Sequence, residues 1–464
     1  MPADPIISVS GLRGVVGDSL TEDVAARYAL ALAAHLPPGA VVIGRDGRPS
    51  GPLFVRAIAA ALTGAGRPVI DAGVAATPTV GVLVREQRAA GGIQISASHN
   101  PPQYNGIKLF NAAGRVIPAV DGQQVLNRYH AAAEQQPPEA PTPHPAATQR
   151  AAAAPPGTPP ALTDTTAAHL ALVEAICDVD RIRSRKFHVL LDANHGAGSV
   201  LARPLLARLG CQATILGGQP DGQFEHVPEP TEANLAPVLD RVVKAQAAIG
   251  FAQDPDADRL AIIDERGRYI GEEKTLALCV DHVLRHQRQG PVAINCSTSR
   301  MTEVLAQRYG VPCFRAKVGE ANVVDLMLQT GAVFGGEGNG GVIDPRVVLV
   351  RDSFVGMALA LDAMAARGLP ASELANELPQ FAIHKTTIST APERVAAALD
   401  ALERRFSDAT ADRLDGLRLD WPDGAWLLVR PSNTELIVRA IAEAPTPERA
   451  QRLCQSAAAV ISAP

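Results

Sequence analysis

The sequence predicts an α/β fold: three consecutive α/β domains with mixed, mostly parallel sheets, then a C-terminal α+β domain. Short apolar runs alternate with longer amphipathic runs from residue 40 to residue 330, which is the pattern of repeated β-α units. A Pro- and Ala-rich stretch interrupts the pattern at 135–160, and period-two alternation replaces it near the C-terminus. A chain of 464 residues is also too long for one hydrophobic core.

The domains follow from these restarts of the β-α pattern. We expect α/β domains at 1–134, 161–253 and 254–370, an extended linker or insertion at 135–160, and the α+β domain at 371–464. Predicted strands are 40–44, 68–71, 92–96, 109–110, 187–191, 213–216, 248–252, 292–295, 313–316, 381–388 and 425–429. Predicted helices are 53–64, 77–86, 122–133, 199–209, 235–247, 275–286, 300–309, 321–329, 393–405 and 447–458.

Composition excludes several classes of protein. A net charge of −5 gives no basic footprint for nucleic acid, and no apolar run approaches the ~20 residues of a membrane span. The six cysteines form no C-x-x-C pair, which argues against a zinc site and a disulfide framework. The N-terminus lacks the features of a signal peptide. We therefore expect a cytoplasmic protein, a monomer or homodimer, that binds neither nucleic acid nor a membrane.

The first of four short polar segments, which we call polar islands, is the loop that ends an apolar strand at 92–95. Ser98 lies beside His99, and Lys108 follows ten residues later. These side chains offer a nucleophile or phosphate carrier and two groups for proton transfer. An ordinary polar turn is the alternative, because Ser, Asn, Pro and Gly are common turn residues.

The second island places Asp254, Asp256 and Asp258 directly after the predicted strand 248–252, with Arg259 next. Carboxylates at this spacing repel one another, and a Mg²⁺ ion bound by their hard oxygens removes that repulsion. An EF-hand would need Gly where Arg259 stands, and a haloacid-dehalogenase-like phosphatase would need Thr where Asp258 stands. A plain acidic surface turn is the remaining alternative.

Two further islands could bind a phosphosugar. The Gly-rich segment 335–341 lets a ligand approach the backbone, and its Glu337 can accept hydrogen bonds from two adjacent hydroxyls. Arg430 begins the run Arg430-Pro431-Ser432-Asn433-Thr434-Glu435, in which a guanidinium, hydroxyls and an amide could surround a phosphate. A flexible loop and an N-capped turn are the respective alternatives. The segment 44–51 follows the first strong strand, and its Arg45 reads as a structural ion-pair partner of Asp46 or another acid. The segment 192–196 also reads as structural.

Taken together, in this order, the four islands resemble the α-D-phosphohexomutase family. The matching segments are Ser96-Ala97-Ser98-His99-Asn100-Pro101, Asp254-Pro255-Asp256-Ala257-Asp258-Arg259, Gly336-Glu337 and Arg430-Pro431-Ser432-Asn433-Thr434-Glu435. The resemblance implies four domains around one deep cleft. It also implies reversible interconversion of hexose 6-phosphate and hexose 1-phosphate, with hexose 1,6-bisphosphate as intermediate or activator.

The resemblance assigns roles residue by residue. Ser98 would carry the phosphoryl group and, with the three aspartates, hold one Mg²⁺ ion. Lys108, then His99, would transfer the proton, and Arg13 matches an N-terminal active-site element. As a base, Lys108 would need a pKa below its usual value of about 10.4. The implied substrate-binding residues are Arg259, Glu337, Asn339, Arg430, Ser432, Asn433, Thr434 and Arg439.

The Gly-rich segment 335–341, which we call the sugar loop, departs from the common family pattern. Asn339 stands in place of a Ser, and Gly341 stands in place of a His. This Gly-Glu-Gly-Asn-Gly-Gly form resembles a subgroup related to both phosphoglucosamine mutases and phosphomannomutases. The segment 96–101, which we call the serine loop, favours glucosamine phosphate as substrate, with mannose and glucose phosphates as alternatives. A Mg²⁺-dependent phosphosugar phosphatase and a non-catalytic phosphosugar-binding protein are the competing functions.

Overall fold

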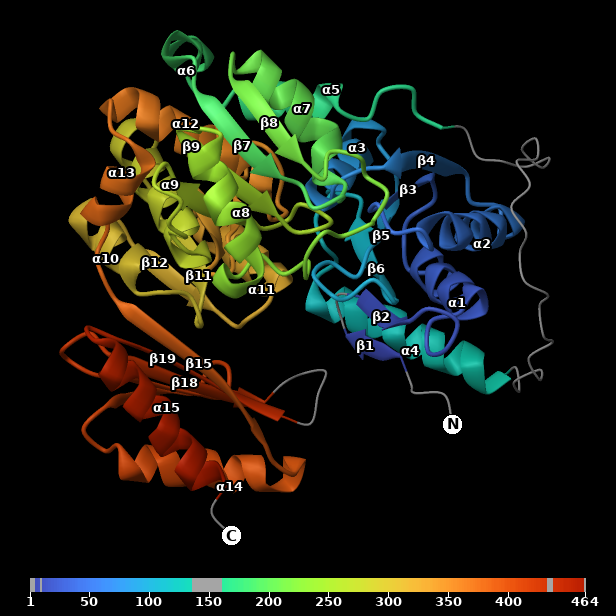
Figure 1. The fold of residues 1–464 in the computed structure, drawn as a ribbon. Helices are drawn as coiled ribbons and strands as arrows, with labels where there is room; N and C mark the ends of the chain where they lie inside the picture. Colours follow the sequence, from blue (N-terminus) through green and yellow to red (C-terminus); the bar gives the residue numbers. More distant parts are fainter. Residues whose placement is uncertain (1–4, 9–10, 136–160, 432–436, 463–464) are drawn as a thin grey trace.

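The computed structural model describes residues 5–8, 11–135, 161–431 and 437–462. Three α/β units lie side by side, and a C-terminal α+β domain extends from them (Figure 1). The linker predicted at 135–160 falls outside the described residues except for Gln135, where a helix ends.

The first unit is a six-stranded mixed sheet with helices on both faces. Val41 and Ile43 pack toward one hydrophobic core and Val42 toward another, so this strand is apolar throughout. The sheet order is β1 (Ile6–Ser8), β2 (Gly11–Val15), β6 (Tyr104–Asn111), β5 (Gly91–Ile95), β3 (Val41–Arg45) and β4 (Val69–Val74). Its helices are α1 (Glu22–Ala33), α2 (Gly51–Gly64), α3 (Thr77–Glu86) and α4 (Ala119–Gln135).

The second unit is a four-stranded sheet in which three strands are parallel and the edge strand at 260–264 runs antiparallel to its neighbour. The order is β10 (Leu260–Asp264), β9 (Ile249–Gln253), β7 (His188–Asp192) and β8 (Gln212–Leu216). The helices are α5 (Ala167–Glu174), α6 (Val179–Arg185), α7 (Gly198–Arg208) and α8 (Glu232–Lys244). The boundary expected between residues 253 and 254 cuts this sheet, because β9 and β10 form one antiparallel ladder across the Asp254 loop. The second unit therefore continues through Asp264.

The third unit repeats the four-stranded design. Its order is β12 (Cys313–Ala316), β11 (Val292–Asn295), β13 (Phe334–Glu337) and β14 (Gly341–Ile343). The helices are α9 (Glu272–His286), α10 (Met301–Arg308), α11 (Glu320–Thr330), α12 (Ser353–Arg367) and α13 (Ala371–Glu377). Helix α12 is buried along most of its length and packs against helices of the second and third units. One hydrophobic core consequently includes side chains from all three units.

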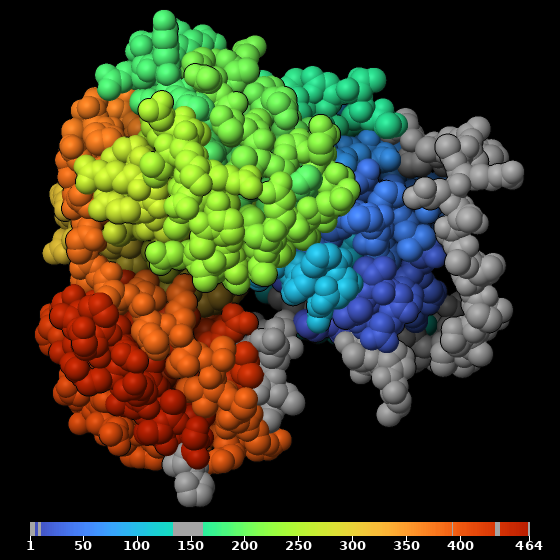
Figure 2. Space-filling view, in the orientation of Figure 1, coloured from blue at the N-terminus to red at the C-terminus, as the bar shows by residue number. Residues whose placement is uncertain are grey.

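The C-terminal domain is an antiparallel sheet covered by two helices. The order is β15 (Ala382–Ser389), β19 (Ile437–Ala444), β18 (Trp426–Pro431), β17 (Leu417–Asp420) and β16 (Thr410–Asp412), with α14 (Pro392–Arg405) and α15 (Pro447–Ile461). The expected boundary at 370–371 lies too early, because α13 packs on α9 and α12 of the third unit. Figure 2 shows the molecule hollowed between this orange-red domain and the blue first unit.

Within the described ranges, no single helix is both long and apolar enough to cross a membrane; α12 and α13 pass that test only as a pair bent by 90°.

Candidate active site

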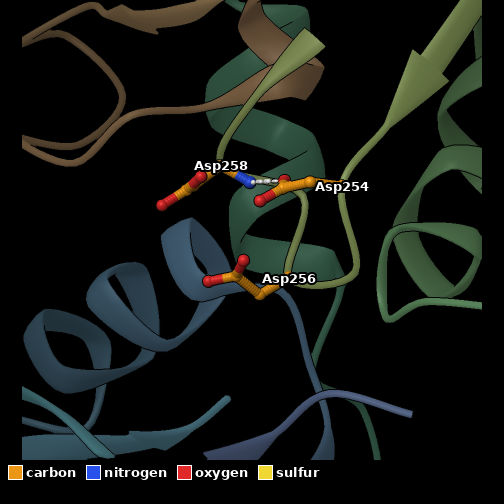
Figure 3. Close-up of side chains that lie close together, drawn as sticks. All are labelled: Asp254, Asp256 and Asp258. Atoms are coloured by element: carbon orange, nitrogen blue, oxygen red, sulfur yellow. Dashed lines mark hydrogen bonds between the residues drawn. The ribbon is translucent and has the colours of Figure 1, made fainter. Parts of the chain in front are cut away.

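Three aspartates lie together on the loop between β9 and β10. One oxygen from each of Asp254, Asp256 and Asp258 falls within 4.8 Å of the others, and all three residues are buried. The loop turns sharply at Ala257, whose φ is +55°. Asp254 Oδ1 accepts the backbone N–H groups of Asp258 and Arg259, both at 3.1 Å. This turn directs the three carboxylates to the same side (Figure 3).

The serine loop between β5 and β6 of the first unit meets these aspartates. Ser98 is buried, and its Oγ donates to Asp254 Oδ2 at 2.6 Å and lies 3.3 Å from His99 Nδ1. Its backbone N–H donates to Ser96 Oγ at 2.8 Å, and Ser96 in turn donates to Asp46 at 2.7 Å. Residues 156 positions apart in the sequence are therefore in direct contact.

The aspartate cluster has the chemistry of a Mg²⁺ site. Burial and the charges of Asp258 and Asp256 raise the pKa of Asp254 well above its usual range. Asp256 Oδ1 and Asp258 Oδ1 are buried and have no hydrogen-bond partner among the described residues. Anionic oxygens left unpaired in a protein interior are unfavourable, and a small divalent cation prefers such hard ligands. The residues present therefore fit one Mg²⁺ ion.

Lys108 on β6 contacts the aspartate cluster, and its pKa is shifted in the direction opposite to the one expected for a base. Its Nζ donates to Asp256 Oδ2 at 2.5 Å and to Asp258 Oδ2 at 2.7 Å. Burial acts to lower the pKa of Lys108, but the two carboxylates outweigh burial and raise it. The expected lowering of this pKa is absent because the nearest charges are negative. Thr77, at the start of α3, also donates its hydroxyl to Asp256.

His99 and two arginines surround the serine. Arg259, burial and Arg13 hold the pKa of His99 well below its usual range, so this imidazole is neutral at pH 7. Arg13 Nη1 donates to Asn100 Oδ1 at 2.9 Å, and burial lowers the pKa of Arg13. Arg259 Nε lies 3.9 Å from Asp258 Oδ1. The sequence-predicted Arg13, His99 and Arg259 thus all lie beside Ser98 or the aspartates.

Glu337, the last residue of β13, accepts four hydrogen bonds. Glu337 Oε1 accepts from Asn295 Nδ2 at 2.7 Å and from the Gly319 N–H at 3.0 Å. Oε2 accepts from Arg351 Nη1 at 2.6 Å and from Asn339 Nδ2 at 3.4 Å. Burial would raise the pKa of Glu337, but Arg351 and Asn295 hold it below its usual value. Glu337 is therefore a carboxylate whose weakest contact is Asn339.

Arg351 connects the sugar loop to the aspartates and fills the space beside Gly341. Its Nη1 donates to Glu337 and its Nη2 donates to Asp258, both at 2.6 Å, and its backbone N–H donates to Glu320 at 2.7 Å. A Cβ on Gly341 would lie 2.3 Å from Arg351 Cδ. The side chain of Arg351 thus occupies the place into which a residue larger than Gly at position 341 would project.

The run 430–435, the predicted phosphate loop, is described only at its first two residues, and Arg430 there is linked to the third unit through Asp415, whose Oδ2 also accepts the Val318 N–H at 3.0 Å. Arg430 Nε donates to Asp415 Oδ2 at 2.9 Å within the C-terminal domain. Arg439 on β19 is the register partner of Arg430 on β18. The predicted residues Ser432, Asn433 and Thr434 lie outside the described residues.

Sequence reasoning did not single out several residues that shape this site. Arg351 and Glu320 lie in or beside loops of the third unit, and Thr77 and Arg48 lie at loop ends of the first unit. The available signal was weak: Arg351-Asp352-Ser353 is a short polar interruption between an apolar run and an apolar helix. Neither Arg nor Thr in such a place forms a recognisable motif by itself.

Comparison with known proteins covers most of the chain. Family models for the phosphoglucomutase/phosphomannomutase α/β/α domains I, II and III match residues 5–136, 167–267 and 272–381, and the C-terminal domain model matches 390–460. A relative from Methanopyrus kandleri named probable phosphoglucosamine mutase is 32% identical, over 96% of this chain and 95% of its own length. A phosphoglucomutase/phosphomannomutase from Thermococcus kodakarensis is 34% identical, over 95% of each chain.

A solved structure shows the same architecture. The phosphoglucomutase/phosphomannomutase family protein from Burkholderia thailandensis superposes with a TM-score of 0.79 at 27% identity, covering 98% of this chain and 97% of that one. The four domain models occur in the order in which the four units occur here. The chain belongs to the phosphoglucomutase/phosphomannomutase family.

Proposed function

We propose that this protein is a phosphohexomutase that interconverts hexose 6-phosphate and hexose 1-phosphate through a phosphoserine at Ser98. The contact between Ser98 Oγ and Asp254, at 2.6 Å within the cluster of three buried carboxylates, carries the proposal. A hydroxyl beside a candidate metal site suits phosphoryl transfer, which depends mainly on positioning and charge neutralisation.

The aspartates and the Ser98 phosphate would hold one Mg²⁺ ion. When bound, Mg²⁺ would neutralise the charge of the transferring phosphoryl group. Arg13 Nη1 donates to Asn100 in the serine loop, and Arg259 Nε lies 3.9 Å from Asp258 Oδ1. Two guanidinium groups beside Ser98 favour a phosphate there for the same electrostatic reason.

The reaction needs a group that takes the proton from the attacking sugar hydroxyl. As the P–O bond to Ser98 breaks and the bond to the sugar oxygen forms, that hydroxyl loses its proton. His99 is neutral and lies 3.3 Å from Ser98 Oγ, so it has a site that can accept a proton. Lys108 is charged in its ion pairs with Asp256 and Asp258, so we assign it to charge neutralisation and proton donation in this state.

Glu337 is the proposed recognition group for sugar hydroxyls. Its bond from Asn339 is long at 3.4 Å, whereas the bonds from Arg351 and Asn295 are 2.6 and 2.7 Å. A sugar hydroxyl can therefore replace the Asn339 amide while Arg351 and Asn295 hold the carboxylate in place. Asn339 would then be free to turn toward the substrate.

The second phosphate of the intermediate would be bound by the C-terminal domain. We propose that Arg430, Ser432, Asn433, Thr434 and Arg439 bind the phosphate that is not reacting. The hollow between the C-terminal domain and the first unit would admit the substrate (Figure 2). The hexose 1,6-bisphosphate would form and turn over there between the two half-reactions.

Glucosamine phosphate is the proposed substrate, in line with the name of the Methanopyrus kandleri relative. A side-by-side comparison of kcat/KM for glucosamine, mannose and glucose 6-phosphates tests this assignment, because discrimination is the ratio of those values. We expect the highest value for glucosamine 6-phosphate. A higher value for mannose or glucose 6-phosphate would reassign the substrate, and no interconversion of any of the three would overturn the proposed function.

A further inference from the structure

Arg48 lies shortly after β3, and every N–H of its guanidinium donates a hydrogen bond, to carbonyls of residues 98–104 or to Asp46. Its side chain is fully buried. Nε donates to Asp46 Oδ2 at 3.1 Å. Nη1 donates to the carbonyls of Pro101 and Tyr104, at 2.7 and 2.8 Å, and Nη2 donates to those of Ser98 and Asn100, at 2.7 and 2.6 Å. A guanidinium has five N–H donors, and each one has an acceptor here.

The backbone that Arg48 binds is strained at the proposed phosphoryl carrier. Ser98 has φ +50°, in the left-handed region that residues other than Gly rarely adopt. Such a conformation persists only where surrounding contacts hold it, and Ser98 lies between β5 and β6, outside the sheet ladder. From this geometry we propose that Arg48 is a positioning residue, which fixes the serine loop so that Ser98 Oγ faces Asp254.

The second unit covers the guanidinium on its remaining side. The ring of Phe224 lies 5.0 Å from the Arg48 guanidinium carbon. A Cβ on Gly47 would lie 2.5 Å from the His195 carbonyl oxygen, and a Cβ on Gly222 would lie 2.8 Å from Arg48 Cα. The two backbones therefore touch, and Gly222 has φ +71°, which Gly adopts without strain.

The segment 192–196, read from the sequence as structural, holds this cover in place. The His195 carbonyl accepts the Gly222 N–H at 3.0 Å, and His195 Nδ1 lies 2.8 Å from Asp221 Oδ1. The Asn194 side chain accepts the Glu225 N–H at 2.9 Å. The second unit therefore supplies a cover for Arg48 in addition to the aspartate loop. Water excluded by this cover cannot compete for the four loop carbonyls.

The test compares three variants of the full-length enzyme with Mg²⁺ present. Arg48→Lys keeps the charge but leaves three donors for five acceptor positions. Phe224→Leu removes the aromatic cover and leaves every polar group of the site. Arg67→Lys is the matched control: Arg67 is also in the first unit and also binds carbonyls, those of Ala33, Leu36 and Pro37 at the end of α1 and just after it. The readouts are kcat and KM separately, the melting temperature, and phosphate on Ser98 by intact mass.

We expect Arg48→Lys to lower kcat by about 100-fold, the effect of misplacing a reacting group by about 1 Å, with KM close to that of the wild type. Phe224→Leu should lower kcat by a smaller factor, and Arg67→Lys should leave both constants unaltered whatever its melting temperature. A kcat for Arg48→Lys equal to that of Arg67→Lys would overturn the inference, as would a change confined to KM. If Arg48→Lys does not fold, an unaltered kcat in Phe224→Leu overturns it instead.

The inference rests on the proposed function, and the experiment separates the two. A wild-type enzyme that carries no phosphate on Ser98 and interconverts no hexose phosphate contradicts the proposed function. An active, phosphorylated wild type with a fully active Arg48→Lys variant contradicts only the role of Arg48.

Discussion

The packing of Arg351 against Gly341 predicts that even Gly341→Ala will lower the stability of the sugar loop. In Gly341→Ala, the new methyl group would lie 2.3, 2.9 and 3.1 Å from Cδ, Cγ and Cβ of Arg351. Carbon atoms in contact prefer about 3.5–4.0 Å, so the stem of Arg351 must move by about 1 Å. These atoms form the base of the side chain, so a rotation of its end does not relieve the overlap.

The magnitude follows from the ion pairs that such a shift would break. Arg351 donates to Glu337 and Asp258 at 2.6 Å, and a shift of about 1 Å lengthens both beyond hydrogen-bonding distance. Disrupting a buried ion pair costs about 3–5 kcal/mol. We therefore expect Gly341→Ala to lower the free energy of opening of the β13–β14 hairpin by about that amount. Hydrogen exchange resolved along the chain measures this local free energy.

A double-mutant cycle isolates the cause. Gly341 lies in a strand without a left-handed φ, where Gly→Ala by itself stabilises by about 0.4–1 kcal/mol through the unfolded state. In an Arg351→Ala background we therefore expect Gly341→Ala to be neutral or stabilising. The same cost in both backgrounds, or a cost below about 0.5 kcal/mol in the wild-type background, would refute the assignment of this space to Arg351.

Three further outcomes follow from the site. Ser98→Ala should abolish interconversion while the enzyme still binds hexose 6-phosphate by calorimetry; normal turnover would exclude Ser98 as the carrier. Mg²⁺ at 100 times its dissociation constant should stabilise the fold by about 2.7 kcal/mol, a gain that a chelator removes and Asp256→Asn lacks; an equal gain in that variant would place the ion elsewhere. Burial raises the pKa of Glu273 to about 8, with Lys385 opposing. Its buried carboxyl therefore favours the fold at low pH, and this contribution is lost as the pH rises from about 4.3 to about 8. Glu273→Gln should accordingly gain stability relative to the wild type over that range in melting experiments, whereas a constant difference would contradict the raised pKa.

Strands and helices with strong apolar patterns could be predicted closely from the sequence. The strands at 292–295 and 313–316 and the helix at 77–86 have the predicted bounds. The strand 292–295 is apolar up to its final Asn, and the helix 77–86 has Pro in its first turn and an apolar centre. The boundary at 253–254 was wrong because nothing in the run Leu260–Ile263 shows that it pairs back onto β9.

The part of the candidate site whose residues cluster in the sequence could be predicted. The part formed by single residues that are far apart in the sequence could not. Ser98 and the three aspartates each form a local motif, and in the structure Ser98 donates a hydrogen bond to Asp254. Arg48 reaches carbonyls 50 to 56 positions away, and Arg351 reaches an aspartate 93 positions away. A lone arginine forms no pattern, so its partners emerge only from the fold. The state of Lys108 was missed for a related reason, since its pKa depends on which charges the fold places nearest.

The central claim is that Ser98 carries the phosphoryl group between the two positions of the sugar, and the fate of a labelled phosphate tests it most directly. Enzyme labelled on Ser98 is mixed with hexose 6-phosphate in a single turnover, and the protein and sugar products are separated. We predict that the label leaves Ser98 and appears in hexose 1,6-bisphosphate and then in the hexose monophosphates, without release of inorganic phosphate. Label on an aspartate, or its steady release as inorganic phosphate, would contradict the account and indicate a phosphatase.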